Sequence, residues 1–171
     1  KEWKFSIQDG TVAFGSAYNN WAISAPFMKK SGISFSDIFD YCSKEGGQKE
    51  LAHKSPLHEV ALEMAIRHIQ PPTLAQKVRI PIIWKGDLES KVGKELMNCD
   101  ASGDVVLMVT KIIMDKHAGE VAVGRLFSGT IQKGQTLYVA GQPAPQRVQT
   151  VALMVGADRI AIDDAKAGNI V

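Results

Sequence analysis

The stretch that decides the fold of the second half of the chain is Glu120-Val-Ala-Val-Gly-Arg-Leu-Phe-Ser-Gly-Thr-Ile-Gln-Lys-Gly-Gln-Thr-Leu-Tyr-Val139. Apolar residues alternate along it with small or polar ones, a pattern that is typical of β-strands. Gly124 and Gly129 interrupt the alternation, and Lys133-Gly134 predicts a turn before a further strand. Because glycine inside a strand usually marks a bulge or a close backbone approach, this stretch predicts a sharply bent strand, as small closed barrels require.

The alternating pattern continues on both sides of this stretch, from Lys77 to Val171. Turn residues separate the apolar runs, and short strands joined by turns favour an antiparallel barrel. We therefore expect strands over residues 78–84 (with Pro81 on an edge), 105–113, 120–127, 130–131, 135–140, 147–155, 159–162 and 168–171.

The first part of the chain has helical signals instead. Residues 1–14 predict a hairpin, and Ser34 with Asp37 three residues later predicts a capping box at the start of a helix. Ser55-Pro56 predicts the start of a second helix that ends at about Gln70, where Pro71-Pro72 follows. The pattern thus divides the chain into two domains, residues 1–73 and residues 74–171.

Charge and composition narrow the classes of function. The 171 residues are 45% hydrophobic and carry 20 Lys and Arg against 18 Asp and Glu, a balance that gives no electrostatic footprint of a free-standing nucleic-acid binder. No apolar run approaches the roughly 20 residues that cross a bilayer, so we expect no membrane partner. Cys42 and Cys99 are too few for a disulfide framework, which favours reduced thiols that serve as packing in a cytoplasmic protein.

Several patterns come close to catalytic motifs without completing one. Gly93-Lys94 is followed by Glu95, and Leu88 stands where a phosphate loop needs its first glycine. Asp100-Ala-Ser-Gly103 fits a magnesium-proximal GTPase pattern but precedes an apolar strand instead of ending one, which favours a turn. No self-contained catalytic site is therefore expected.

The remaining polar candidates also have simpler interpretations. His58 and His68 are ten residues apart with no carboxylate or cysteine in register, so we expect core or boundary histidines and no metal site. Asp163-Asp164 could form a carboxylate pair, but its flanking residues favour a solvated turn. Gly15-Ser16-Ala17 ends a strand in small residues and leaves backbone N–H groups open, either to a ligand or simply as a turn.

Read together, these motifs resemble archaeal-type elongation factor 2, the translocation GTPase of protein synthesis, which is related to bacterial factor G. The resemblance covers essentially the whole chain. Its most specific parts are residues 10–17 with Trp21-Ala22, the run 56–76, Asn98-Cys-Asp100, the run 119–134 with its Gly-Arg-Leu-Phe-Ser-Gly-Thr core, and Ile162-Asp-Asp164 with Ala167-Gly-Asn-Ile170.

The resemblance implies an internal fragment. Residues 1–73 would be the α+β remnant that closes a P-loop GTPase domain, and residues 74–171 an antiparallel barrel of the translational-GTPase second-domain type, truncated before its closing strand. The phosphate loop, switch segments, magnesium aspartate and Asn-Lys-x-Asp motif of the family precede this segment. GTP and Mg would therefore belong to the full-length parent, and we expect this chain to hold no cofactor and to be inactive alone.

The resemblance also assigns candidate sites. Gly15, Ser16 and Ala17 match the guanine loop, whose N–H groups would face the base oxygen. Arg125, Lys111 and Lys133 are candidate contacts to small-subunit rRNA of the ribosome, although Arg125 could equally pair with an acidic neighbour and hold the barrel together.

Two other functions remain open on the residues alone. One is a stand-alone barrel module that binds RNA or protein, and the other is an enzyme that uses Asp163, Asp164 and a histidine. For the translational segment we expect a monomer in isolation.

Overall fold

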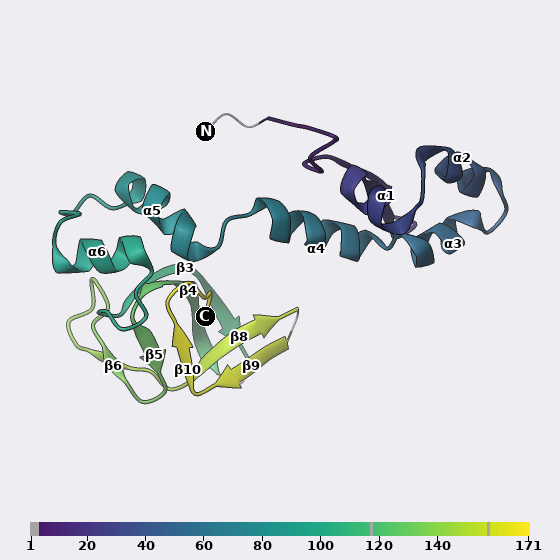
Figure 1. Cartoon of the computed structure of the whole chain (residues 1–171). Helices are drawn as coiled ribbons and strands as arrows, with labels where there is room; N and C mark the ends of the chain where they lie inside the picture. The colour runs from purple at the N-terminus through teal and green to yellow at the C-terminus, as the bar shows by residue number, and fades with distance from the viewer. Residues whose placement is uncertain (1–3, 117, 157) are drawn as a thin grey trace. The chain divides into compact units, whose positions relative to one another are not determined.

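The computed structural model describes residues 4–116, 118–156 and 158–171, and divides the chain between Gln70 and Pro71 into two compact units. The sequence placed this boundary at 73/74, which falls inside the first turn of helix α5 (Pro72–Ile83). Figure 1 follows the chain from the helices of the first unit to the strands of the second. Each unit is described separately below.

In its described residues, the first unit consists of a short hairpin and four helices. Strands β1 (Ala13–Ser16) and β2 (Trp21–Ser24) are antiparallel, and β2 leads directly into α1 (Ala25–Ser31). Helices α2 (Phe35–Ser43), α3 (Gly47–Lys54) and α4 (Leu57–His68) follow. One buried group, Ala22, Phe27 and Val60, packs β2, α1 and α4 together, and Ile23 and Leu51 are also fully buried in this unit.

The capping box predicted for α2 is confirmed. The Ser34 hydroxyl accepts from the Asp37 N–H, and the Asp37 carboxylate accepts from the Ser34 N–H at 2.7 Å. Hydrogen bonds from Ser34 lower the pKa of Asp37 below its ordinary value. This local motif therefore fixes the start of α2 independently of tertiary packing.

Three expectations for this unit differ in whole or in part from the structure. Residues 1–3 of the predicted 1–14 hairpin lie outside the described residues. The turn expected at Asp9-Gly10 is present, since the Thr11 N–H donates to Ser6 O at 3.1 Å, but among the described residues strand pairing begins at Ala13, whose partner strand is β2. His58 and His68 are exposed and not part of a core, since the unit buries only Val60 of α4 and leaves the apolar side chains Leu62, Ile66 and Ile69 open. Cys42, expected as packing, is exposed as well.

The second unit opens with two helices, α5 and α6 (Lys91–Asn98). The strand predicted over residues 78–84 is wrong, because these residues form the second half of α5 with Pro81 in its last turn. Burial explains the difference: Gln76 and Ile80, four residues apart, lie 2% and 1% exposed on one helix face. Val78 and Ile82 form a second, exposed apolar stripe, which produced the alternation in the sequence.

Strands follow in the rest of the second unit, and the pairs that the structure describes are antiparallel. The main hairpin joins β3 (Val106–Asp115) to β4 (Gly119–Ser128). The other pairs are β5 (Thr130–Gln132) with β10 (Asp164–Lys166), β6 (Thr136–Leu137) with β7 (Gln146–Arg147), and β8 (Val151–Val155) with β9 (Asp158–Ile162). The antiparallel strands are thus confirmed, whereas their closure into a barrel stays a prediction.

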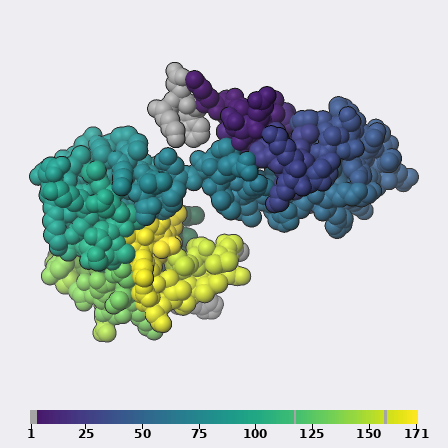
Figure 2. Space-filling model, in the orientation of Figure 1, coloured from purple at the N-terminus to yellow at the C-terminus, as the bar shows by residue number. Residues whose placement is uncertain are grey.

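The last residues of the chain lie antiparallel to β4. Gly124 and Val171 exchange both backbone hydrogen bonds at 2.8 and 2.9 Å, and the Leu126 N–H donates to Asn169 O at 3.0 Å. In Figure 2 this yellow C-terminal segment runs beside the teal surface of the helices of the same unit. The core beneath it is a buried group made of Leu126, Ile131, Val151 and Ala165.

Two glycines in and just after β4 lie at close backbone approaches, and beside Gly124 the register with β3 shifts between Val109 and Lys111. A Cβ on Gly124 would lie 2.4 Å from the Met108 backbone oxygen of the neighbouring strand. Gly129 has φ 78°, and a Cβ there would lie 2.7 Å from Val105 Cα. Only glycine fits both positions, so the interruptions mark close backbone approaches.

Candidate functional site

The Gly15-Ser16-Ala17 loop lies where β1 ends and the turn to β2 begins. Register pairs Gly15 with Ala22 and Ser16 with Trp21. The Asn20 N–H closes the turn by donating to Ala17 O at 3.3 Å. The Ser16 hydroxyl oxygen also accepts from the backbone N–H of Asn19 at 3.2 Å and from its side-chain amide at 3.0 Å. The Ser16 side chain is therefore used to shape the turn.

The direction of the loop amides follows from how β2 is held on its other side. The Ala22 N–H donates to Ser55 O at 3.1 Å, and the Ser55 hydroxyl donates back to Ala22 O. Both polar backbone groups of Ala22 thus point away from β1, which makes Gly15 and Ala22 a non-hydrogen-bonded pair. The N–H of Gly15 consequently points outward from β2.

Two further features describe the outer edge of the Gly15-Ser16-Ala17 loop. A Cβ on Gly15 would lie 2.5 Å from Trp21 O, so no larger residue fits without moving the hairpin. Ala17 is exposed, and within the part of the chain that the structure describes its N–H has no hydrogen-bond acceptor. The loop can therefore offer a backbone donor to a carbonyl oxygen of a ligand.

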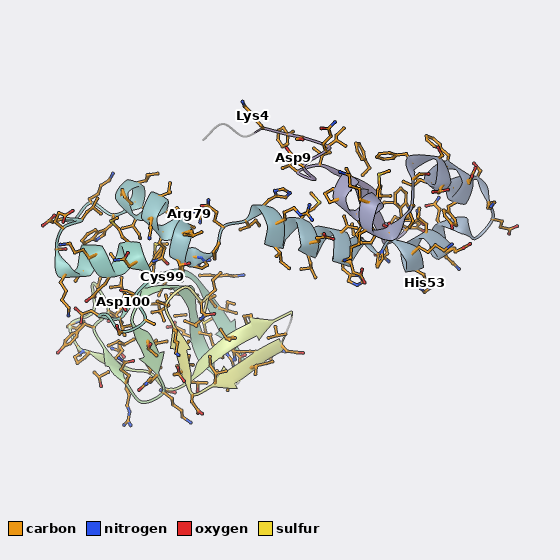
Figure 3. The ribbon with its side chains drawn as sticks, viewed as in Figure 1. Lys4, Asp9, His53, Arg79, Cys99 and Asp100 are labelled. Carbon is orange, nitrogen blue, oxygen red and sulfur yellow. The ribbon has the colours of Figure 1, made fainter. Side chains whose placement is uncertain are left out.

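A shallow hollow of about 410 Å³ adjoins the same turn. Figure 3 labels one of its residues, His53, at the end of α3. Its lining mixes polar and apolar surface and consists of Tyr18, Asn19, Asn20, Lys49, Ala52 and His53. No sequence spacing links residues 18–20 to residues 49–53, so the sequence analysis missed this hollow.

Arg125 is half-buried on β4 and serves a structural contact. One guanidinium nitrogen, Nη1, donates to Gly168 O at 3.0 Å, and the Gly168 N–H donates to Leu126 O at 2.7 Å. Among the described residues its side chain makes no ion pair with a carboxylate, so the acidic neighbour considered from the sequence is replaced by a backbone carbonyl. Because a guanidinium has five N–H donors, further donors remain for a second acceptor.

Lys111 and Arg125 lie near each other in the register of the β3–β4 hairpin, whereas Lys133 lies elsewhere in the unit. Lys111 on β3 lies opposite Val123, two residues from Arg125 on β4, so both cations share one face of the hairpin. Lys133 follows β5 in a different place, where its N–H donates to Asp163 O at 3.2 Å. The three candidate cations thus form two groups.

Lys133 lines a hollow of about 770 Å³ that also contains a cation missed by the sequence analysis. This cation is Arg147, brought beside the Lys133 turn because the β6–β7 register pairs Thr136 with Arg147. Asp163 and Asp164 line the same hollow, so the expected solvated turn is partly wrong: Asp164 begins β10. The hollow therefore has both cationic and anionic side chains, which can bind charged or hydrogen-bonding groups of a ligand.

In the described ranges, the groups considered for catalysis or metal binding form no metal-binding cluster. The described residues contain no group of three or more His, Cys, Asp or Glu side chains that could hold a metal ion. Asp100 forms a turn, as predicted, in which its carboxylate accepts from the Ser102 N–H at 2.9 Å and from the Ser102 hydroxyl at 2.7 Å. These hydrogen bonds lower the pKa of Asp100. No helix in the described ranges is long and apolar enough to cross a membrane.

Comparison with known proteins points to one family. Residues 104–171 match the family model of elongation factor G domain 2. The chain is 59% identical over 170 residues to elongation factor 2 of Thermoplasma acidophilum, which covers 99% of this chain and 23% of that protein. It is 59% identical over 171 residues to the protein of Picrophilus torridus (100% and 23%), and 57% over 170 residues to that of Methanococcus vannielii (99% and 23%).

The chain thus spans about a quarter of the length of these relatives, and the similarity extends over both of its units. The model match lies wholly within the β-rich second unit. The resemblance inferred from the motifs is therefore confirmed, and the chain is a homologue of a segment of archaeal elongation factor 2.

Proposed function

We propose that this chain is a non-catalytic segment of a GTP-dependent elongation factor that drives translocation of tRNA and mRNA on the ribosome. The observation that carries the proposal is the high identity to elongation factor 2 along the whole chain. In this role the first unit completes a guanine pocket, and the second forms a barrel that docks on the small ribosomal subunit.

The guanine contact would be made by the Gly15-Ser16-Ala17 loop. Its support is the exposed Ala17 N–H, which has no acceptor among the described residues, and the Gly15 position that admits no side chain. A backbone donor favours guanine, which carries an oxygen at the position where adenine carries an amino group. GTP and Mg would be held mainly by other parts of the full-length protein.

A nucleotide series tests this contact in a full-length elongation factor 2 that carries the segment. Ala17→Pro removes the N–H donor, while Ala17→Ser keeps it and serves as the control. We expect Ala17→Pro to weaken GTP and ITP by about tenfold and to leave a 2-aminopurine nucleotide, which lacks the 6-oxygen, nearly unchanged. Equal weakening of all three nucleotides would show that the loop does not read the base oxygen.

The isolated chain is the second test. Because phosphoryl transfer depends on magnesium, a phosphate-binding loop and their charges, a chain without them should bind GTP far more weakly than the micromolar range. Titration of a fluorescent GTP analogue measures this directly. Micromolar binding would contradict the proposal that the nucleotide site is incomplete here.

Ribosome docking would involve the cations of the second unit. Lys111 and Lys133 are exposed, and Arg125 keeps donors free beside its bond to Gly168. Contacts to phosphates weaken steeply with salt, so replacing a contacting lysine by glutamine should lower the salt dependence of subunit binding by about one unit of slope. Lys77→Gln on α5 is a control in the same unit and with the same charge change.

A further inference from the structure

One glutamine side chain holds three elements of the second unit together. Gln76 on α5 is 2% exposed, and its amide nitrogen Nε2 donates to Leu96 O at 2.5 Å and to Phe127 O at 2.9 Å. Leu96 belongs to α6 and Phe127 to β4. A single side chain therefore ties both helices of the unit to its main hairpin.

The orientation of this amide follows from its partners. Leu96 O and Phe127 O are carbonyl oxygens, which only accept hydrogen bonds, so the amide must present its nitrogen to them. The amide oxygen Oε1 then points elsewhere, and within the described residues it is buried without a donor. Buried acceptors nearly always accept a hydrogen bond in folded proteins, so we expect a bound molecule to donate one to Oε1.

The surroundings limit what that ligand can be. Leu96 and Phe127 also belong to the buried apolar group of Ile80, Leu96 and Phe127, so the surroundings of Oε1 are mainly apolar. Figure 3 labels Cys99 at the end of α6, where the Cys99 N–H donates to Leu96 O at 3.4 Å. Burial raises the pKa of the Cys99 thiol, which therefore stays protonated, but among the described residues it donates no hydrogen bond to Oε1.

We propose that Gln76 is a buried pin between α5, α6 and β4, and that its Oε1 binds one internal water molecule. Water is a neutral donor small enough for an enclosed position, and internal waters typically bridge such unsatisfied polar groups. Through this contact, α5, α6 and β4 gain and lose their protection from hydrogen exchange together. Its helix, α5, is the first element after the boundary at Gln70 and Pro71.

The pin is tested by hydrogen exchange on the full chain. Gln76→Met keeps the length of the side chain but removes both donors, and Gln142→Met makes the same change at an exposed glutamine. Loss of two buried hydrogen bonds should raise exchange in peptides of α5 and α6 by about tenfold or more, with no such rise for Gln142→Met. Unchanged protection of α5 in Gln76→Met would overturn the pin.

The water site is tested without that variant, so a failure of Gln76→Met to fold leaves it testable. A long-lived water should give cross-relaxation to the Gln76 side-chain amide in the native chain, and an ordered water should lie within about 3.2 Å of Oε1 in a crystal structure. Both signals should persist in Cys99→Ala. Absence of the water, or a Cys99 thiol bonded to Oε1 in its place, would overturn the hydration site.

Discussion

Replacing Gly168 by alanine should destabilise the second unit through two separable effects. Gly168 has φ 94°, a conformation that L residues rarely adopt, and this alone costs about 1–2 kcal/mol for alanine. The new Cβ would also lie 3.2 Å from both Cys99 Sγ and Pro72 Cβ, which adds about 1 kcal/mol or more of overpacking. We therefore expect a loss of about 2–4 kcal/mol in the free energy of unfolding.

Gly141→Ala separates the two effects. Gly141 has φ 85°, but nothing lies within 4 Å of a Cβ placed there, so this variant measures the backbone cost alone. A difference of about 1 kcal/mol between the variants corresponds to about 4–8 °C in midpoint for a domain of this size. Calorimetry and urea denaturation both measure it.

A double-mutant cycle assigns the contact cost to its partner. Cys99→Ala removes the Sγ atom, so Gly168→Ala should cost less in that background than in the native chain. The reasoning would be refuted if Gly168→Ala were no more destabilising than Gly141→Ala, or if the Cys99→Ala background made no difference.

Three further predictions follow from the same kind of argument. Gly15→Ala should lower the urea midpoint of the first unit, because its Cβ would lie 2.5 Å from Trp21 O, and Gly32→Ala, with nothing within 4 Å, is the control. Ser34→Ala should lower the urea midpoint of the first unit at pH 7 and somewhat less in acid, because the Ser34 hydroxyl bonds both the Asp37 N–H and the Asp37 carboxylate, and only the bond to the carboxylate titrates. Since the folded pKa of Asp37 is depressed, its contribution is present above the usual value of 3.8 and is lost as the pH falls through the folded pKa. Lys91→Met should loosen the start of β3, because Lys91 Nζ lies 3.1 Å from Asp104 Oδ2 and 3.5 Å from Glu95 Oε1, with hydrogen exchange as the measurement.

The sequence predicted elements well wherever a local signal decided them. The capping box at Ser34 and the turn at Asp100 depend on side chains three or fewer residues apart, and both are present. The close backbone approaches at Gly124 and Gly129 were likewise predictable from the glycines. Short-range chemistry of this kind does not depend on where distant segments pack.

Errors arose where tertiary burial decides the structure. Residues 78–84 alternate like a strand, yet α5 forms because Gln76 and Ile80 are buried against α6 and β4. Helix α6 also escaped the sequence analysis, although Ser90 supplies a recognisable N-cap that accepts from the Gly93 N–H at 3.1 Å. Gly93 was tested only as part of a phosphate loop, and its helical role was overlooked.

The guanine-loop candidate and the Arg125 candidate both depend on backbone atoms. Patterns of side chains in the sequence therefore could not predict their geometry. The loop at Gly15 offers an N–H whose direction is set by Ser55, 33 residues from its partner Ala22. Arg125 is oriented by the carbonyl oxygen of Gly168, 43 residues away. Neither relation leaves a spacing rule in the sequence, because a backbone donor or acceptor carries no residue identity. What the sequence does retain is the glycine that each geometry requires, so the informative positions in this chain are those where a side chain would not fit.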